Sequence, residues 1–466
     1  MDESYSMQKG ILIPDHVKQS AKPIKTRNHV PLSVWQHFAN GLFYQRDDSP
    51  LDHIGTLGSS DPFLPRAVAQ DFLNNKETKT VHEIGPGNFD FARHFVDTVK
   101  LTLEDIAYHG HDFSDASYAF VQDQLGKEIV FHKRSLDQFP DEVKDDPLYL
   151  ILTEVLDDTL TEFYIRHDDT DYILCVTPTM KSDVHFPNKT KAARLFALHG
   201  DLSKHVSRLA QPGKTEKEYT AQDIIDIIDS FQLDALEDIY PSFLHHLTYP
   251  KWEFNQIPID EAPSLPWRKG PGDFKEYGHQ VLSFFKDQLS RAKDTHVVSI
   301  PLAGVALLWK LRERKNINIH FFDYGYKDID EDVGPFAVYN GQITAPVNFG
   351  VLQHAAELLG FNTTLEKNQY YIKRMLGEDT VKIGYIQKVL DNMPSISAGA
   401  KQVAYGAFQE RVQELNPGEN ITEDAILNYR VRREEMDKFI AAAKNLGKLK
   451  KDFTFTEGSY HLAVSK

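Results

Sequence analysis

Two acidic residues that follow a run of apolar residues are the first candidates for chemistry in this sequence. Leu148–Leu152 predicts a buried strand, and Glu154 and Asp157 come shortly after it. Carboxylates at a strand end can bind a guanidinium or ammonium group and hold it beside a reaction partner. Asp157 could instead cap the turn that follows. We predict catalytic roles for both residues, with Glu154 facing the reacting group and Asp157 assisting it.

A glycine turn is the second feature with a chemical meaning. Thr80–Ile84 predicts a strand, Gly85–Gly87 a tight turn and Phe89–Val99 a helix. This combination forms a cradle for a nucleotide-like ligand, because glycine lets the backbone approach it closely. A dinucleotide motif would have a third glycine where this chain has Asp90, whose carboxylate would repel a pyrophosphate. S-adenosylmethionine (SAM), which has no phosphate and carries a cationic sulfonium, fits better.

Two further strands supply polar ends to the same predicted site. Tyr108–Phe113 predicts a strand ending near Asp112, where a carboxylate accepts hydrogen bonds from ribose hydroxyls; a helix cap is the alternative role. Glu128–His132 predicts the next strand, followed by residues that would border an adenine. Alternating strands and helices predict a parallel sheet with ligands at the carboxyl ends of its strands. The predicted cofactor-binding residues are Glu83, Gly85, Pro86, Gly87, Asp112, Phe113, Ser135, Leu136 and Thr153.

Several segments resemble the motifs of one enzyme family, in the same order. Glu83–Gly87 is close to Glu-Leu-Gly-Pro-Gly, and Thr153–Leu160 keeps both acidic residues of a motif that usually begins with Asn and ends with Pro. Phe321–Gly325 and Gln342–Phe349 are similar to Ile-Asp-Tyr-Gly and to Asp-Leu-Thr-Ala-His-Val-Asp-Phe. The chain thus resembles the MidA-type SAM-dependent methyltransferases, whose mitochondrial members assist the assembly of respiratory complex I. The resemblance covers roughly residues 35–160 and 295–380.

The resemblance implies a fold, a cofactor and an acceptor. The fold is α/β, a Rossmann-like class I SAM-dependent methyltransferase core with a seven-stranded, mostly parallel sheet. Mitochondrial members are linked to arginine methylation, so a protein arginine guanidinium is the first acceptor to consider. Leu42–Tyr44 and Gly58–Phe63 resemble the N-terminal Gly-Tyr-Tyr and Thr-Ser-Pro segments of the family. This resemblance implies that Ser59 and Ser60 contact SAM and that Tyr44 closes over the ligand; a packed cover is the alternative. Asp323 and Tyr324 would line the acceptor pocket, although Asp323 could equally hold a turn.

Departures from the family motifs leave the acceptor open. Thr153, Leu160, Pro346 and Asn348 each replace a different residue of the family pattern. One alternative is a methyltransferase acting on an amine, amide or hydroxyl of a small molecule or peptide. Another is a catalytically inactive assembly protein with the same fold. A nicotinamide-dependent oxidoreductase is disfavoured by Asp90 and by the order of the motifs.

Composition limits the partners. The chain has 466 residues, 41% of them hydrophobic, and a net charge of −16, which favours a large enzyme and argues against nucleic acid as a partner. That charge would suit a basic protein or peptide substrate, and a homodimer stays open. No apolar stretch is long enough to cross a membrane. An N-terminus unlike a signal peptide and a single cysteine, Cys175, predict a cytoplasmic protein.

Two pairs of histidines are candidates for metal ligands. His109 with His111, or His245 with His246, could bind a metal, but such pairs in a chain with 20 histidines are more often ordinary polar residues. Methyl transfer from a sulfonium needs no metal. We therefore predict no metal site.

The order of the motifs predicts six segments. Residues 1–30 form a flexible arm and 31–77 a helical N-terminal cover that opens with a helix over Ser33–Asn40. The SAM-binding core occupies 78–184 and resumes over 296–377, beginning with a strand at Val297–Ile300. Between its two parts, 185–295 is an inserted substrate or lid region with a proline-rich loop at Pro250–Pro271. Residues 378–466 form a mainly helical C-terminal extension.

Overall fold

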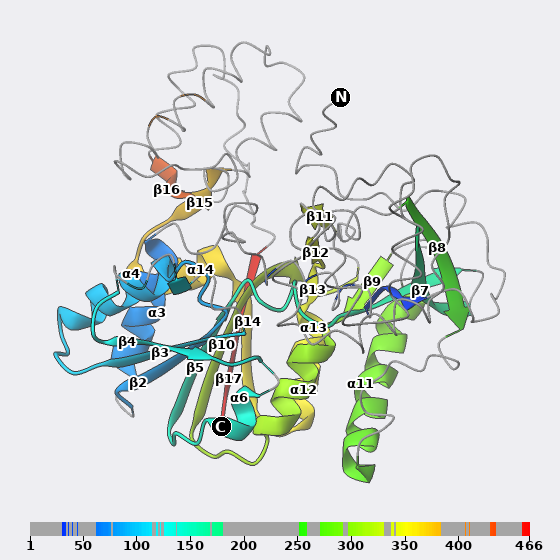
Figure 1. Ribbon diagram of the computed structural model, residues 1–466, viewed down its shortest axis with the longest axis horizontal. Helices are drawn as coiled ribbons and strands as arrows, with labels where there is room; N and C mark the ends of the chain where they lie inside the picture. The colour runs from blue at the N-terminus through cyan, green and yellow to red at the C-terminus, as the bar shows by residue number, and fades with distance from the viewer. Residues whose placement is uncertain are drawn as a thin grey trace, which may run out of the picture. The chain divides into compact units, whose positions relative to one another are not determined.

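Two compact units make up the chain in the computed structural model (Figure 1). The first unit contains Met1–His53, Leu156–Lys310 and Gly325–Leu359; the second contains Ile54–Val155, Leu311–Tyr324 and Gly360–Lys466. The structure describes residues 30–33, 36, 40, 44, 62–75, 78–113, 118–119, 122, 125–136, 138–167, 170–179, 251–258, 271–291, 297–329, 337–339, 342–383, 406, 410, 429–434 and 459–466.

A mostly parallel sheet forms the centre of the second unit. Along one path its strand order is β14-β17-β10-β5-β2-β3-β4, and the short β13 (Val347–Asn348) pairs with the last two residues of β10, which makes eight strands in all. The strands on the path are β2 (Thr80–Ile84), β3 (Ala107–Asp112), β4 (Ile129–Lys133), β5 (Leu148–Thr153), β10 (Ile317–Tyr326), β14 (Asn362–Lys367) and β17 (Ser459–Ser465).

The direction in which the strands are added reverses between β2 and β5. From β2 the chain adds β3 and then β4 on one side, and afterwards returns to add β5 and β10 on the other side. The pairings of β2 with β3, β3 with β4, β2 with β5 and β5 with β10 are all parallel. The loops that leave β2 and β5 therefore diverge, and in sheets of this kind ligands bind in the crevice at such a switch point.

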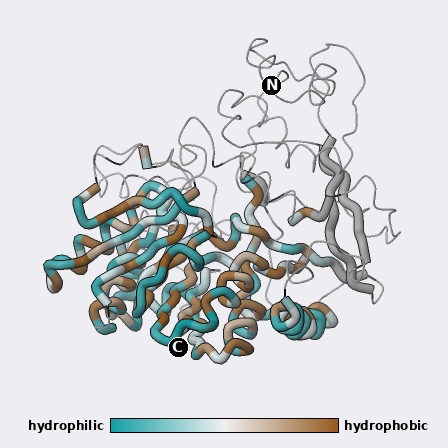
Figure 2. The backbone as a smooth tube through the Cα atoms, turned by 60° about the horizontal axis from the view of Figure 1, so that its bottom comes forward, coloured by the Kyte–Doolittle hydropathy of each residue, from teal (hydrophilic) through white to brown (hydrophobic). Residues whose placement is uncertain are grey.

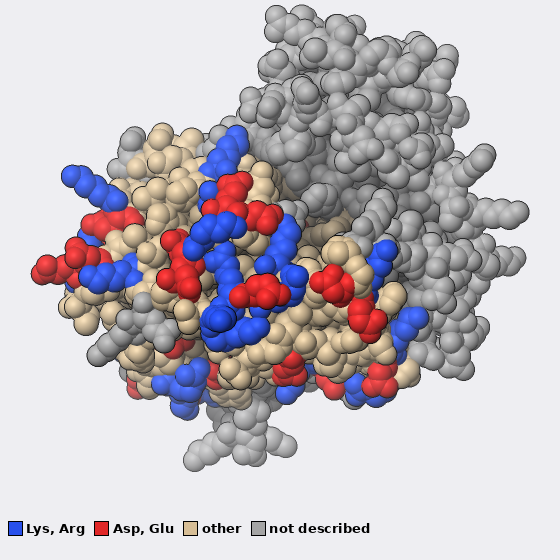
Figure 3. Space-filling model, turned by 90° about the horizontal axis from the view of Figure 1, so that it is seen from below, with Lys and Arg blue, Asp and Glu red and all other residues tan. Residues whose placement is uncertain are grey.

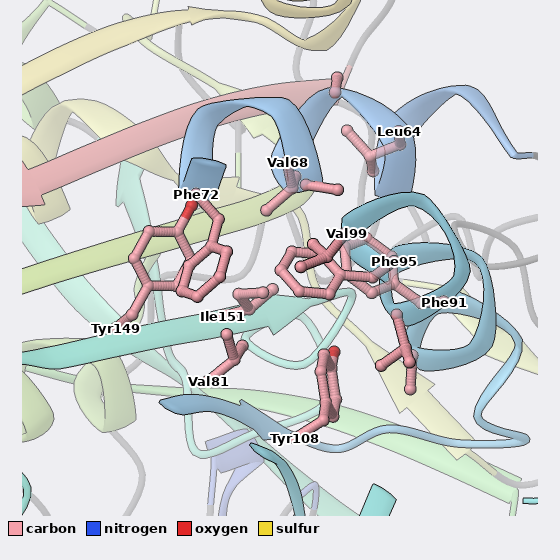
Figure 4. Packing of buried hydrophobic residues seen from close by; sticks show 14 of the residues in the cluster. Leu64, Val68, Phe72, Val81, Phe91, Phe95, Val99, Tyr108, Tyr149 and Ile151 are labelled. Atoms are coloured by element: carbon pink, nitrogen blue, oxygen red, sulfur yellow. The ribbon is translucent and has the colours of Figure 1, made fainter. Parts of the chain in front are cut away.

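Three helices of the described part of the chain cover one face of this sheet. They are α3 (Phe63–Asn74), α4 (Asp90–Lys100) and α14 (Asn368–Leu376). Phe72 of α3 lies between Phe95 of α4, at a ring distance of 5.6 Å, and Tyr149 of β5, at 5.1 Å, as Figure 4 shows. Tyr371 of α14 donates a hydrogen bond of 3.1 Å to Asp71 of α3. These contacts join the helices and the sheet into one apolar core.

The sequence of α4 explains its position. Its buried residues recur at the helical period, so one side of the helix faces the core. They are Phe91, Ala92, Phe95, Val96 and Val99. Asp90 in the first turn and Lys100 in the last suit the helix dipole. In Figure 2 hydrophobic and hydrophilic residues alternate along the described elements, as expected where one side of each is buried.

The first unit contains an antiparallel sheet in the order β1-β7-β6-β9, with β8 also paired to β7. These strands are β1 (Val30–Pro31), β6 (Glu162–His167), β7 (Thr170–Thr179), β8 (Lys251–Pro258) and β9 (Val297–Ile300). In the part of this unit that the structure describes over several consecutive residues, the helices are α11 (Gly272–Ser290), α12 (Leu302–Leu311) and α13 (Phe349–Leu358). Tyr277 of α11 donates to the backbone oxygens of Val305, at 3.4 Å, and Ala355, at 3.3 Å, and so ties the three helices together.

Each unit also contains short helices or strands outside its main sheet. The second unit also contains α6 (Phe139–Glu142) and the antiparallel pair β15 (Thr380–Lys382) and β16 (Arg430–Arg432). In the first unit β11 (Ala337–Tyr339) and β12 (Gln342–Thr344) form a second antiparallel pair. None of the described helices is long and apolar enough to span a membrane. On the face in Figure 3 basic and acidic side chains are interleaved, so the described part of that face carries no large patch of one sign.

The strands predicted at the glycine turn and after it are confirmed, and three other predictions need correction. Val297–Ile300 is a strand, but it pairs with β6 of the first unit and not with the parallel sheet. Within the predicted loop Pro250–Pro271, Lys251–Pro258 forms β8 because the neighbouring β7 accepts it as a pairing partner. The predicted mainly helical extension over 378–466 is wrong for its last residues, which form β17 inside the sheet.

The remaining domain predictions are not tested. Ser33, Gln36 and Asn40 are helical, in agreement with the predicted opening helix. Residues 1–29, 180–250 and 384–405 lie outside the described part of the chain, together with most of 411–458. Cys175 lies in β7, where the structure describes its backbone but not its side chain.

Leu462→Ala tests whether β17 belongs to the core. Leu462 is fully buried between β10 and β14, so the variant should lower the free energy of unfolding by about 2–5 kcal/mol. Leu101→Ala is the matched control, because Leu101 is 87% exposed and its loss should cost less than about 0.5 kcal/mol. Denaturant unfolding measures the free energy of unfolding of both variants. Equal stabilities of the two variants would contradict the position of β17.

Candidate functional site

The glycine turn after β2 has the backbone conformation that glycine favours. Gly85 and Gly87 have φ values of +67° and +55°. The amide of Gly85 donates a hydrogen bond of 2.9 Å to the backbone oxygen of His111, which joins the ends of β2 and β3. A Cβ at Gly85 would lie 2.7 Å from Cγ2 of Val155. Only glycine therefore fits between the end of β2 and the segment that leaves β5.

The other strand ends on this edge are partly accessible. Asp112 ends β3, and its backbone oxygen accepts a hydrogen bond of 2.6 Å from the amide of Arg134 after β4. Asp112, Phe113, Ser135 and Leu136 are all partly exposed, as are Gly85 and Gly87, whereas Pro86 is buried. The structure thus brings these predicted cofactor-binding residues to the carboxyl edge of neighbouring strands.

An aromatic side chain packs directly behind the turn. Phe89 has a left-handed backbone, with φ +63°, and its ring is buried. A Cβ at Gly110 of β3 would lie 2.6 Å from this ring, so the glycine makes room for it. Sequence reasoning assigned Phe89 to the helix and missed this packing role.

Glu83 faces the interior and not the accessible edge. Its Oε2 accepts a hydrogen bond of 2.8 Å from the hydroxyl of Tyr108, and the residue is 1% exposed. Burial raises the pKa of the Glu83 carboxyl to about 8, which keeps it protonated at neutral pH. Its predicted contact with a cofactor stays a prediction, and what the structure describes is a buried, neutral carboxyl.

Glu154 has an unusual backbone at the end of β5. Its φ of +53° lies in the left-handed region, which a residue of this kind rarely adopts. The amide of Glu154 donates a hydrogen bond of 2.7 Å to the backbone oxygen of Phe322, which fixes this conformation. Such strain costs on the order of 1–3 kcal/mol and is concentrated at functional sites.

A small pocket lies beside Glu154 at the carboxyl ends of β5 and β10. The ammonium of Lys382 in β15 lies 3.6 Å from Oε1 of Glu154, and its side chain is 7% exposed. The residues that line the pocket come from six elements or their ends: Leu64, Thr153, Glu154, Phe322, Asn368, Lys382 and Arg430. All of them belong to the second unit. The structure thus brings together Thr153 and Glu154, two of the predicted site residues.

Sequence reasoning missed Asn368, Lys382 and Arg430. Asn368 is the first residue of α14, which follows β14 directly. Lys382 and Arg430 are partners in the pair of β15 and β16. No spacing in the sequence joins two residues so far apart, and both lie in the segment predicted to be mainly helical.

Asp157 and Tyr44 lie in the first unit, where they belong to a different network. The backbone oxygen of Asp157 accepts hydrogen bonds from the Gln36 side chain, at 3.0 Å, and the Ala345 amide, at 2.9 Å. The Tyr44 hydroxyl donates to the carboxylate of Asp158 and accepts from the amide of Gln342 at 2.6 Å. Gln36, Asn40 and Tyr44 are spaced by four residues, so they lie on one helical face. Their predicted functional roles are not tested.

The end of β10 alternates between the two faces of the sheet. Phe322 lines the pocket, whereas the next residue, Asp323, points to the opposite face. Asp323 is 2% exposed and its Oδ1 accepts a hydrogen bond of 2.8 Å from the Tyr324 amide. Both residues belong to β10, so this contact tests neither the predicted place of Asp323 in an acceptor pocket nor its alternative role in holding a turn. Ser59 and Ser60 lie outside the described residues.

Four histidines stack across β2, β3 and β4. Nδ1 of His82 lies 2.9 Å from Nε2 of His111, and Nδ1 of His109 lies 2.8 Å from Nε2 of His132. Burial lowers the pKa of His82 to about 4 and that of His111 to about 2, so both are neutral. Among the described residues no group of three or more metal-ligating side chains could hold a metal ion. His245 and His246 are not described.

Comparisons with known proteins gave structural matches alone. No protein-family model matches the chain, and no curated protein matches its sequence. The chain is similar to two crystal structures of proteins from Burkholderia thailandensis that belong to one superfamily. One is uncharacterized, with a TM-score of 0.45, and the other, with a TM-score of 0.46, is a candidate methyl transferase bound to S-adenosyl-homocysteine. Each has 12% sequence identity and covers 94% of this chain and 88% of its own.

Glu83→Gln tests the buried neutral carboxyl. The pKa of Glu83 is about 8 in the folded chain against an ordinary 4.5, so folding takes up a proton between these values. The contribution of this residue to stability is therefore fully present below pH 4.5 and is lost as the pH rises through 8. Glutamine stays neutral at every pH. The free energy of unfolding of the variant should therefore rise relative to that of wild type, by on the order of a few kcal/mol between about pH 5 and pH 9.

Denaturant unfolding of both proteins across this pH range measures the difference. His82 and His111 destabilise the fold as the pH falls below their ordinary value of 6.5, but both proteins contain them, so their effect cancels. A stability difference that does not change with pH would mean that Glu83 is ionised in the folded chain.

Proposed function

We propose that this chain is a SAM-dependent methyltransferase whose cofactor lies along the carboxyl edge of β2, β3 and β4. One observation carries the proposal: the glycine turn Gly85–Gly87 closes β2 at the switch point, directly beside the end of β5. A ligand at this turn would meet backbone amides and the N-terminus of α4 without a Cβ in the way. The resemblance to the MidA-type methyltransferases, which includes this turn and segments beyond it, implies the same cofactor.

The residues at this edge fit an adenosine with a cationic sulfur. The turn offers close backbone approach, and Asp112 at the end of β3 would accept hydrogen bonds from ribose hydroxyls. Ser135 and Leu136 would border the adenine, and Thr153 would lie near the sulfonium. SAM supplies a methyl group that leaves its sulfur by in-line displacement. The chain would hold the acceptor in line and exclude water.

The acidic residue at the start of α4 argues against a dinucleotide cofactor. The Asp90 amide donates a hydrogen bond of 3.1 Å to the Asn88 side chain, and Arg93 donates to the Asp90 carboxylate. A pyrophosphate at this helix N-terminus would face that carboxylate. A nicotinamide-dependent oxidoreductase is therefore the weaker proposal.

The acceptor is the second half of the proposal, and the residues beside Glu154 bear on it. A protein arginine, which the family resemblance implies, would need carboxylates for its guanidinium. Glu154 supplies one, but Lys382 lies 3.6 Å from it and balances its charge. We therefore favour a small-molecule or peptide acceptor over arginine. A catalytically inactive assembly protein is the remaining alternative, and it would differ by its failure to transfer a methyl group.

Gly85→Ala tests the position of the cofactor. The added Cβ should abolish measurable binding of S-adenosylhomocysteine, because it would clash with Val155 and push the turn out of place. Gly360→Ala is the control: its φ is +77°, but a Cβ there meets nothing within 4 Å. Both variants should lose about 1–2 kcal/mol of stability from backbone strain alone, with the clash adding to this at Gly85.

Calorimetric titration measures the affinity of S-adenosylhomocysteine and of NADH for wild type and for both variants. Wild type and Gly360→Ala should bind S-adenosylhomocysteine and not NADH. Binding of NADH alone would favour the oxidoreductase, and binding of S-adenosylhomocysteine to Gly85→Ala with wild-type affinity would remove the turn from the site.

Glu154→Gln tests the predicted catalytic residue. Incubation with methyl-labelled SAM and a host extract should label an acceptor with wild type, and the variant should lose about tenfold or more of that labelling rate. Separation of the products by size shows whether the acceptor is a protein or a small molecule. Equal labelling by the variant would exclude Glu154 from the mechanism. No labelling by wild type, with S-adenosylhomocysteine bound, would favour the inactive assembly protein.

A further inference from the structure

Two histidine rings link the beginning and the end of the segment between β4 and β5. We call this segment, residues 134–147 with α6 inside it, the β4–β5 connection. Near its beginning, Nη1 of Arg134 lies 3.2 Å from Nδ1 of His111. Nε2 of His111 lies 2.9 Å from Nδ1 of His82, and Nε2 of His82 lies 2.6 Å from Oδ2 of Asp145, near the end of the connection. Three hydrogen bonds thus form one chain across β2 and β3.

The groups at the two ends of this chain determine where its protons lie. A guanidinium can only donate hydrogen bonds, and an ionised carboxylate can only accept them. Nδ1 of His111 therefore accepts from Arg134, and the proton of this ring lies on Nε2 and is donated to His82. The proton of His82 lies on Nε2 as well and is donated to Asp145. All three bonds form together only when both rings are neutral, and burial favours this state because it lowers the pKa of both.

Burial alone does not require polar side chains at these two positions. His82 and His111 are 2% and 1% exposed, and an apolar pair of similar shape could replace two buried hydrogen-bonded groups at little cost in stability. A fully paired polar network, in contrast, holds its members in one arrangement. The two rings therefore contribute a defined geometry more than they contribute stability.

The middle of the connection rests on the same two rings. Phe139 of α6 is fully buried, and its ring packs edge-on against His82, at 5.7 Å between centroids, and against His111, at 4.9 Å. Within the connection, Nε of Arg134 also donates a hydrogen bond of 2.7 Å to Glu142. The histidine pair thus contacts the connection at its beginning, its middle and its end.

The connection carries two residues of the proposed cofactor edge. Ser135 and Leu136, which would border the adenine, directly follow Arg134, whose side chain the chain of hydrogen bonds holds. The backbone oxygen of Ser135 accepts a hydrogen bond of 3.1 Å from the amide of Phe139, so both residues belong to the turn that leads into α6. A displaced connection would displace this turn.

From these contacts we propose that His82 and His111 are positioning residues, which seat the β4–β5 connection and with it the adenine end of the cofactor site. The inference rests on the proposed function and adds two residues that act through the connection. A site that is assembled for only a fraction of the time binds its ligand more weakly by that fraction. Loss of the chain should therefore weaken every ligand that contains the adenine, and by the same factor.

His111→Leu tests the proposal, because it cuts the chain in the middle and leaves the backbone bond from Gly85 to His111 in place. Calorimetry should show affinities for S-adenosylhomocysteine and for 5′-methylthioadenosine that are both about tenfold weaker than those of wild type. Without ligand, the amides of Gln138 and Phe139, which donate to Ser135, should exchange their hydrogens about tenfold faster.

Two variants separate the positioning role from a general loss of packing. His111→Gln keeps one acceptor and one donor at the end of the side chain and should recover most of the affinity that leucine loses. His109→Leu is the matched control on the same face of β3: Nδ1 of His109 lies 2.8 Å from Nε2 of His132 in β4, and neither residue belongs to the connection. It should bind and exchange as wild type does.

A third variant and a spectrum cover the case in which His111→Leu does not fold. Arg134→Met cuts the chain at its partly exposed beginning, where the side chain is 17% exposed, and should give the same losses. In wild type at neutral pH, nitrogen NMR of labelled histidines should show His82 and His111 neutral with the proton on Nε2; His82→Gln and His111→Gln assign the signals. A charged ring, or a proton on Nδ1 of either ring, would contradict the chain.

The outcomes distinguish this proposal from the proposed function. If neither nucleoside binds wild type, the proposed function fails, and hydrogen exchange alone decides whether the rings hold the connection. Affinities that stay unchanged in folded His111→Leu would overturn the positioning role. A loss for S-adenosylhomocysteine without a loss for 5′-methylthioadenosine would overturn it too, because the effect would then lie at the amino-acid end of the cofactor. Thermal unfolding without ligand confirms that the compared proteins are folded.

Discussion

The parallel pairing of β2 with β5 is the constraint on which the site depends. It sets His82, Glu83 and Ile84 opposite Leu150, Ile151 and Leu152. Because β3 and β10 extend the sheet in opposite directions from this pair, the two chain segments that leave it diverge. A shift of register would move Val155 away from Gly85 and carry Glu154 with it. The glycine turn and the strained glutamate are thus neighbours because of the sheet, before any side chain contributes.

The last strand of the sheet supports this arrangement from a distance. β17 lies between β10 and β14 and pairs with both along most of its length. β14 leads directly into α14, whose first residue, Asn368, lines the pocket. His461 of β17 also lies 3.0 Å from His320 of β10, in the interior. The end of the sequence therefore positions a residue of the site without contributing one itself.

What the sequence could predict follows from the range of the interactions involved. The strand, turn and helix around Gly85 are encoded within twenty residues, by β-branched residues, two glycines and a helical apolar period, and all three were predicted correctly. β17 pairs with β10, about 140 residues earlier, and with β14, about 100 residues earlier, so no local pattern marks it as a core strand. Lys382 and Arg430 come together through a similar long-range pairing. Both lie in the segment that was predicted to be mainly helical, and charged residues are so rarely buried that a single sequence does not predict their burial.

The departures from ordinary folding rules in the second unit coincide at one place. In the core under α3 and α4, apolar faces pack together as the helical periodicity of the sequence predicts, and Phe72 packs edge to face with Tyr149. Beside it, one pocket combines a left-handed glutamate, opposed buried cations and two unpaired polar atoms. The left-handed glutamate and the unpaired polar atoms each cost stability. Proteins tolerate such local conflicts where a ligand resolves them, and this end of the sheet is therefore where we propose that the ligand binds.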